Sequence, residues 1–160
     1  LTARERAACL TRLEAPEARV ALGGALLGTA RAAIDISDGL LADLGHVAER
    51  SRVAAVVELE RVPASRAVAR RLDDPAVIAA LLAGGDDYEL CFTASPRARK
   101  RVAGIARRAG VALSRIGRIE VRRRGAPAVT VLDGEGRPLS VAAAGYDHFA
   151  RAARRRTLLR

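Results

Sequence analysis

The chain has 160 residues, half of them hydrophobic, and carries a formal net charge of +10. This length corresponds to about one domain, and no run of about 18 apolar residues is present to predict a membrane-spanning helix. The charged N-terminal segment is unlike a signal peptide, so we expect a cytoplasmic protein. The chain begins with Leu1 rather than Met, which suggests a fragment of a longer protein.

The positive charge invites a nucleic-acid-binding interpretation, but its distribution weakens it. Of the 28 basic residues only Lys100 is lysine, and this bias toward Arg, together with abundant Ala, is typical of a GC-rich genome. The arginines are scattered except at 122–124 and 151–156, and aromatic residues that could stack on bases make up only 2% of the chain. We expect a solvated basic surface, with a basic nucleic-acid-binding module as the less favoured alternative.

Periodicity and turn residues predict alternating helices and strands. In chain order we expect a helix at 3–14, a loop with a short helix at 21–30, a buried strand at 30–36, a helix at 38–50, a strand at 53–59, a broken helical region at 63–85, a strand at 87–94, a helix at 95–110 and strands at 111–121 and 128–133. The last two strands are expected to form a hairpin. The order predicts one domain of the α/β (α+β) class, a mixed β-sheet flanked by helices.

The helix at 38–50 and the two cysteines allow further predictions. In the helix at 38–50, Leu40, Leu44 and Val47 recur on one face, and the pattern places Asp43 off that face. The two cysteines, Cys9 and Cys91, have no metal-type spacing. We interpret both as free thiols, with Cys91 in the core of a strand.

The segment "DISDGL" places two carboxylates and a hydroxyl where an apolar strand ends and a helix begins. A helix N-terminus offers free backbone N–H groups to an anion, and Mg²⁺ prefers carboxylate and phosphate oxygens. Asp35 and Asp38 could therefore hold a metal ion next to a phosphate. The alternative is that Ser37 or Asp38 only caps the helix, which leaves Asp35 unexplained. Both interpretations remain open from these residues alone.

Two further segments also place a glycine or a carboxylate where an apolar element ends. In "GGDDYEL" at 84–90, two glycines allow close backbone approach and Asp86 follows them, although a simple helix C-terminal turn explains the same residues. In "GYDHF" at 145–149, Tyr146 is one of only two tyrosines. It is either a platform for a ligand or a plug on the core.

These segments, taken in order, resemble the C-terminal half of the thiamine-monophosphate kinase family, the second domain of the aminoimidazole-ribonucleotide-synthetase superfamily. The residues that carry the resemblance are "AAIDISDGLLADLGHVAE" (32–49), "LLAGGDDYELCFT" (81–93), "IGRI" (116–119) and "GYDHF" (145–149). The resemblance implies that residues 1–150 form this C-terminal domain and 151–160 a basic tail. It also implies that the family's N-terminal ATP-binding domain is absent from the chain.

The resemblance further implies Mg²⁺-dependent transfer of the ATP γ-phosphoryl group to thiamine monophosphate, giving thiamine diphosphate. Asp35 and Asp38 would be Mg²⁺ ligands, Ser37 a contact to ATP, and Asp86 and Tyr146 contacts to the substrate. The family usually has Glu at the position of Asp86, so the carboxylate here is one methylene shorter. Direct transfer needs little covalent help from the protein, and we nominate no general base.

The family's N-terminal half supplies further metal-binding aspartates and the main dimer surface. We therefore expect a homodimer in the complete enzyme and no activity from the isolated chain. The alternative within the superfamily is another ATP-dependent member, similar to selenophosphate synthetase or to the purine-biosynthesis enzyme.

Overall fold

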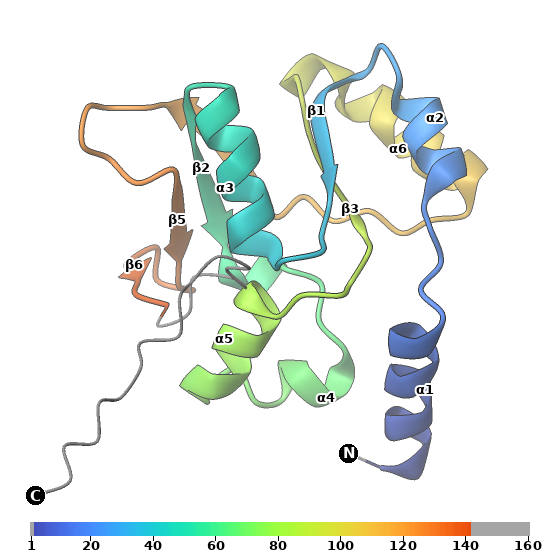
Figure 1. Cartoon of the computed structure of the whole chain (residues 1–160). Coiled ribbons are helices and arrows are strands. Elements are labelled where there is room, and N and C mark those ends of the chain that lie inside the picture. The colour runs from blue at the N-terminus through green and yellow to red at the C-terminus, as the bar shows by residue number, and fades with distance from the viewer. Residues whose placement is uncertain (1, 142–160) are drawn as a thin grey trace, which may run out of the picture.

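The computed structural model describes residues 2–141 (Figure 1). Its helices are α1 (Ala3–Glu14), α2 (Val20–Leu26), α3 (Leu40–Arg50), α4 (Arg66–Ala69), α5 (Pro75–Ala83) and α6 (Arg99–Ala109), with 3-10 turns at Leu59–Arg61 and Pro96–Ala98. Its strands are β1 (Ala30–Asp35), β2 (Val53–Glu58), β3 (Leu90–Ala94), β4 (Gly117–Val121), β5 (Val129–Leu132) and β6 (Pro138–Leu139). This alternation of helices and strands confirms the predicted α/β (α+β) class.

The larger sheet has four strands in the order β4–β2–β5–β6. Strand β2 is antiparallel to β4 and parallel to β5, so that Ala55 lies opposite both Ile119 and Val129. The sheet is therefore mixed, as predicted, but the predicted hairpin between β4 and β5 is wrong. The apolar strand β2 separates them because it is the most buried strand of the sheet. The hairpin instead joins β5 to β6, where the Asp133 N–H donates to the Arg137 carbonyl over 2.9 Å.

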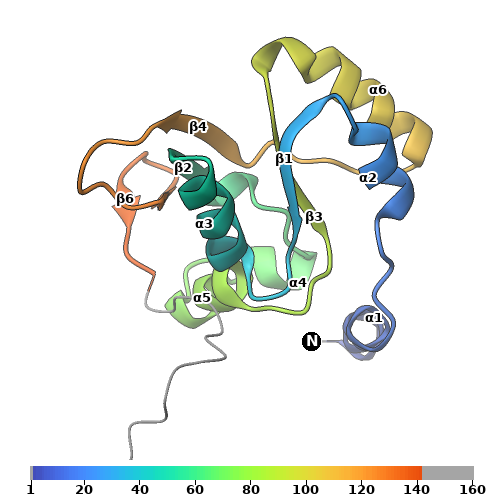
Figure 2. The same ribbon diagram turned by 45° about the horizontal axis from the view of Figure 1, so that its top comes forward.

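The smaller sheet consists of β1 and β3, paired antiparallel with Ile34 opposite Cys91 and Asp35 opposite Leu90. Figures 1 and 2 show this ribbon standing beside the larger sheet, with α3 between them. Side chains of β1 alternate between half-buried and exposed, because successive residues of a strand point to opposite faces. The expectation of a buried strand at 30–36 holds for one face only, because Arg31, Ala33 and Asp35 are exposed on the other.

The main core lies between α3, α5 and the larger sheet. Its buried members are Ile36, Leu40, Leu44, Ala48, Ala55, Val57, Leu59, Val62, Leu82 and Val131. A second, smaller cluster joins α2 to α6 through Leu22, Leu26 and Ile105. All these side chains are aliphatic, as the low aromatic content requires. Burial of such side chains from water is the dominant favourable term in folding.

Helix ends follow the residues that the sequence offers. Helix α6 follows a turn that Ser95 caps by accepting the Arg97 N–H (3.3 Å), and it ends at Gly110 in a left-handed conformation (φ 65°). The helix predicted from Asp38 begins later, at Leu40, and its capping residue is Gly39.

Helix α1 stands apart from both sheets in Figures 1 and 2, and none of its residues is buried. Its N-terminus is closed by a reciprocal pair of bonds between Thr2 and Glu5. Within residues 2–141, no helix has both the length and the apolar character needed to cross a membrane.

Candidate active site

The two acidic segments predicted from the sequence lie side by side. The Ile36 N–H donates to the Glu89 carbonyl (2.9 Å), the Tyr88 N–H to the Ile36 carbonyl (2.8 Å) and the Asp86 N–H to the Ser37 carbonyl (2.9 Å). These three bonds extend the pairing of β1 with β3 into the loops that follow and precede them. The structure therefore brings the predicted phosphate- and metal-binding residues next to the predicted substrate-binding Asp86.

Glycines make this close approach possible. A Cβ atom on Gly85 would overlap the carbonyl oxygen of Ser37. A Cβ on Gly39 would lie 2.8 Å from the carbonyl carbon and oxygen of Ala83, and Gly39 has a φ of 109°, which other residues rarely adopt. Gly39 thus packs against the end of α5.

The structure also bears on the capping alternative for "DISDGL". Helix α3 begins at Leu40, and the residue at its N-cap position is Gly39. Ser37 and Asp38 are half-buried in the turn before the helix, and Asp35 is exposed at the end of β1. Neither Ser37 nor Asp38 therefore occupies the N-cap position of α3.

One acid next to this turn, Asp43, was not predicted from the sequence. Its side chain is buried (3% exposed), and its Oδ2 atom accepts the backbone N–H groups of Ser37 and Asp38, each over 3.0 Å. The placement of Asp43 off the apolar face is wrong. It lies three residues after Leu40 and one before Leu44, both buried, so strict helical spacing would have placed it on the same face.

Tyr88 is a second residue that the sequence reading did not single out. Its hydroxyl donates to Asp86 Oδ1 over 3.2 Å, and this hydrogen bond and the Asp86 charge raise the pKa of Tyr88. The charges of Asp35 and Asp38 also raise the pKa of Tyr88. The phenol is therefore within electrostatic reach of Asp35, Asp38 and Asp86. Asp86 and Tyr88 both have positive φ (65° and 50°). Such conformations cluster at functional sites.

An ion-pair network ties the site to the segment before α2. Glu89 accepts from Arg19 Nε (2.8 Å) and Nη2 (2.7 Å) and from Arg12 Nη1 (3.1 Å). The bond to Arg19 is the main reason that the pKa of Glu89 is lowered. Because the Arg19 side chain is only 12% exposed, this two-pronged contact is sheltered from water on one side. It holds the loop that carries Asp86 and Tyr88.

The donor set fits a cation shared with a ligand better than a self-contained metal cage. Within the described residues, no three or more His, Cys, Asp or Glu side chains are grouped closely enough to hold a metal ion. Magnesium, however, is usually bound through one or two carboxylates, substrate phosphates and water. Asp35 and Asp38, two carboxylates at one strand-to-helix turn, match that donor type.

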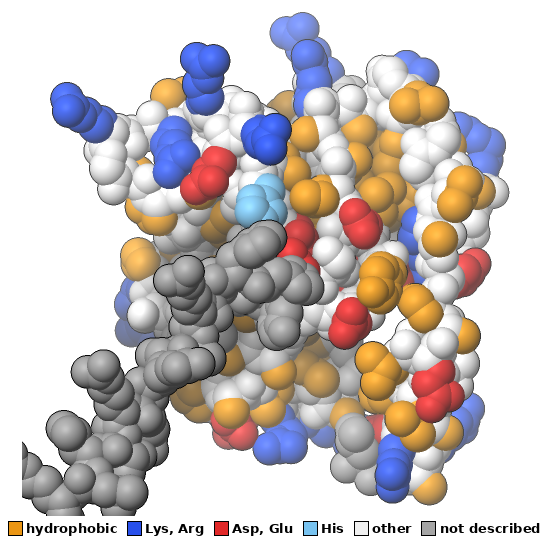
Figure 3. Space-filling model, in the orientation of Figure 1, with side chains coloured by type: hydrophobic (Ala, Val, Ile, Leu, Met, Phe, Trp, Pro, Cys, Tyr) orange, Lys and Arg blue, Asp and Glu red, His pale blue; other side chains and the backbone are white. Residues whose placement is uncertain are grey.

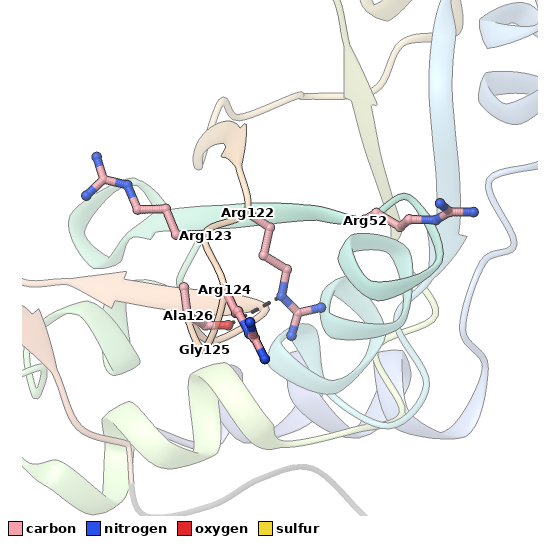
Figure 4. A pocket seen from close by; sticks show the side chains of 6 residues that line it. All are labelled: Arg52, Arg122, Arg123, Arg124, Gly125 and Ala126. Carbon is pink, nitrogen blue, oxygen red and sulfur yellow. Dashed lines mark hydrogen bonds between the residues drawn. The ribbon is translucent and has the colours of Figure 1, made fainter.

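Charge on the surface is unevenly distributed. Acidic side chains lie in the middle of the face in Figure 3, around the end of β1, and Arg and Lys lie mostly toward its edges. A depression elsewhere on the surface is lined by Arg52, Arg122, Arg123, Arg124, Gly125 and Ala126. Its arginine side chains point in different directions (Figure 4). This divergence is unlike a groove that follows a nucleic-acid backbone, although the basic segment 151–156 lies outside the described residues.

One predicted site residue cannot be placed. Tyr146, with the rest of "GYDHF", lies outside the described residues, as does the basic tail at 151–160.

The chain is similar in sequence to a known domain family and to several thiamine-monophosphate kinases. The family of C-terminal domains of AIR synthase related proteins matches residues 7–130. The chain is 38% identical over 135 residues to thiamine-monophosphate kinase of Haemophilus influenzae, covering 84% of this chain and 40% of that protein. It is 41% identical over 114 residues to the enzyme of the same name from Caulobacter vibrioides, covering 69% and 32%.

Solved structures agree with the sequence relatives. The chain superposes on thiamine-monophosphate kinase from Stenotrophomonas maltophilia with a TM-score of 0.73 and 42% identity, covering 82% of this chain and 40% of that one. It superposes on AaThiL complexed with AMPPCP and TMP with a TM-score of 0.64 and 30% identity, covering 89% and 41%. The chain thus spans about 40% of the length of these relatives. It belongs to the family of C-terminal domains of AIR synthase related proteins.

Proposed function

We propose that this chain is the C-terminal part of a thiamine-monophosphate kinase, which transfers the ATP γ-phosphoryl group to thiamine monophosphate. The observation that carries the proposal is the pairing of the Asp35–Asp38 turn with the loop of Asp86 through the Asp86–Ser37 backbone bond. This pairing brings candidate nucleotide-binding and substrate-binding residues to one place. The relative complexed with AMPPCP and TMP supports the same pair of ligands.

Each described residue receives a role consistent with its chemistry. The Ser37 hydroxyl is suited to donate to an ATP phosphate oxygen, and Asp35 and Asp38 would hold Mg²⁺. The bound ion would neutralise charge on the transferring phosphoryl group. The Asp86 carboxylate, supported by the Tyr88 hydroxyl, complements the positively charged thiazolium ring of the substrate. Tyr146 stays a predicted contact to the thiamine moiety.

Alignment of the two phosphate groups is the main task of the protein in such a transfer. A phosphate oxygen of the substrate is already a nucleophile, so the protein mainly has to position it and exclude competing water. The loop bonds between Ser37 and Asp86 and the glycine contact at Gly85 provide a rigid frame for that purpose.

The complete activity requires more than this chain. Since the chain spans about 40% of the length of the Haemophilus influenzae and Stenotrophomonas maltophilia enzymes, we propose that an N-terminal ATP-binding domain supplies further ligands. We also propose that the complete enzyme is a homodimer. The isolated chain should then release no ADP. A cytoplasmic location stays a prediction from the sequence.

The proposal can be tested with a hybrid enzyme. In this hybrid, the matched C-terminal segment of the Stenotrophomonas maltophilia enzyme is replaced by residues 1–160 of this chain. We expect ADP release that depends on both Mg²⁺ and thiamine monophosphate, with the parent enzyme as the positive control. A folded hybrid that binds ATP yet releases no ADP with thiamine monophosphate would contradict the proposal.

The same assay separates the alternatives. ATP consumption with selenide, giving AMP and inorganic phosphate, or ADP release with formylglycinamidine ribonucleotide would point to another member of the superfamily. Nucleic-acid binding by the isolated chain, falling steeply with salt, would support the basic-module interpretation. We expect neither result.

A further inference from the structure

The Asp43 carboxylate is unusual because a single oxygen organises two consecutive backbone amides. Asp43 Oδ2 accepts the Ser37 and Asp38 N–H groups, each over 3.0 Å, from the first turn of α3. The side chain is 3% exposed, so water does not compete strongly for these bonds. In contrast, the side chains of Ser37 and Asp38 belong to the half-buried surface of the turn.

Both amides belong to the residues that carry the proposed ligand contacts. A buried backbone N–H without an acceptor is costly, so the turn needs a partner where it passes over α3. A carboxylate suits this place for two reasons. It forms stronger hydrogen bonds than a neutral acceptor, and its charge is favoured at the N-terminal turn of a helix.

Three sets of contacts then fix the turn from different sides. Asp43 holds its amides from the helix, the Asp86 N–H holds the Ser37 carbonyl from the neighbouring loop, and Gly39 lies against the Ala83 backbone. With amide and carbonyl groups of the turn bonded, the backbone of Ser37 has little freedom to rotate.

We propose that Asp43 is a positioning residue of the active site. By bonding the Ser37 and Asp38 amides, it holds the turn in the conformation that binds the Mg²⁺–nucleotide complex. This inference rests on the proposed function, since it assigns the purpose of the turn to nucleotide and metal binding. It adds a residue that does not itself contact the nucleotide.

A merely structural interpretation makes a different prediction. If Asp43 only stabilises α3, its loss would lower thermal stability and leave ligand binding by the folded protein intact. Asp133 offers a matched control, because its Oδ1 also accepts two backbone N–H groups, from Glu135 (3.0 Å) and Arg137 (2.9 Å), in a turn of the larger sheet. Replacement of Asp133 by Asn removes a charge that likewise accepts two backbone N–H groups, at a more exposed position where Asp133 also pairs with Arg137.

The first experiment uses the 160-residue chain. Amide hydrogen exchange, followed by nuclear magnetic resonance, is compared among the wild type and the Asp43→Asn, Asp43→Ala and Asp133→Asn variants. We expect faster exchange at Ser37 and Asp38 in both Asp43 variants. Asn should be milder because its amide oxygen still accepts. Unchanged protection of both amides in Asp43→Ala would overturn the inference.

The second experiment uses the hybrid enzyme and Mg²⁺–AMPPCP binding by calorimetry, followed by kinetics. In Asp43→Asn we expect binding weaker by about 10- to 100-fold, a higher Mg²⁺ requirement and a lower kcat, with little change in the KM for thiamine monophosphate. Asp133→Asn should change none of these. Normal binding and kcat in a folded Asp43→Asn hybrid would overturn the inference.

The two proposals fail in different ways. A wild-type hybrid that binds Mg²⁺–AMPPCP but does not phosphorylate thiamine monophosphate would contradict the proposed substrate. In that case the binding affinity of the Asp43→Asn hybrid still decides whether Asp43 positions the turn.

Discussion

The backbone N–H of Asp86 donates to the carbonyl oxygen of Ser37 over 2.9 Å, although the two residues lie in segments far apart in the sequence. This bond joins the turn that follows β1 to the loop that precedes β3. It gives a structural reason why two acidic, glycine-containing segments occur in one domain. Each segment alone has a local alternative, helix capping or turn formation, whereas their contact creates a shared polar surface.

The contact depends on Gly85. We expect Gly85→Ala to destabilise the chain by about 1–3 kcal/mol, because the new methyl group would overlap the Ser37 carbonyl oxygen. Urea unfolding of the two proteins measures the difference. Gly23→Ala is the control, since a Cβ there meets no atom within 4 Å and Gly23 lies within α2. Equal stability of Gly85→Ala and wild type would contradict the packing.

Replacement of Asp35 by Asn distinguishes a metal-binding role of this residue from a structural one. Because its side chain is exposed, we expect Asp35→Asn to change the free energy of unfolding by no more than about 0.5 kcal/mol. In the hybrid enzyme the same change should remove most activity and raise the Mg²⁺ concentration needed for half-maximal rate. Asp73→Asn, at another exposed carboxylate, is the control and should keep full activity. Loss of stability without loss of activity would support a structural role.

The Arg19–Glu89 pair predicts a pH dependence of stability. Arg19 lowers the pKa of Glu89 below its ordinary value of 4.5, so the pair stabilises the folded chain above that pH. The stabilisation is lost as pH falls through the lowered pKa of the folded state. Glu89 is 46% exposed, which limits the effect to roughly 1 kcal/mol.

Thermal unfolding at pH 6 and pH 3 measures this effect. We expect Glu89→Gln to lower Tm at pH 6 and to differ less from wild type at pH 3. Glu17→Gln removes the other, more exposed partner of Arg19 and should have a smaller effect at both pH values. A Glu89→Gln deficit that grows on acidification would contradict the assigned ion pair.

The pKa of the Cys91 thiol depends in part on the charge of Asp43. Burial, and to a lesser extent the Asp43 carboxylate, raise the pKa of the Cys91 thiol to about 11. In a Cys9→Ser background, which removes the exposed thiol, we expect slow alkylation at pH 8 that speeds up steadily toward pH 10. Adding Asp43→Asn should lower the pKa of Cys91 and accelerate the reaction. An unchanged rate profile would contradict the proximity of the two groups.

Local sequence patterns predicted most helices and strands, but β4 begins only at Gly117, β6 was not predicted and the strand pairing was wrong. The ends of α6 at Ser95 and Gly110 follow from capping chemistry, which acts between residues a few positions apart. The insertion of β2 between β4 and β5 depends on which strand is most buried, and that is a property of the whole core. Strands β4 and β5, which follow one another in the sequence, are therefore not neighbours in the sheet.

The candidate site was predicted in part for the same reason. Asp35, Ser37 and Asp86 were recognisable because polar residues and glycines stand where apolar elements end. Asp43 was missed because a charged residue within a helix is ordinarily exposed, although its spacing from Leu40 placed it on the buried face. Its two acceptor bonds to the preceding turn could not be read from periodicity. The role of Tyr88 likewise depends on an unusual backbone conformation.

The central claim is that the turn at Asp35–Asp38 and the loop of Asp86 serve one phosphoryl transfer. Phosphorus nuclear magnetic resonance of the hybrid enzyme with Mg²⁺, ATP and thiamine monophosphate tests it most directly. We predict equal amounts of ADP and thiamine diphosphate from the hybrid, and loss of both products on Asp38→Asn. Inorganic phosphate in place of thiamine diphosphate, or full product formation by Asp38→Asn, would contradict the account.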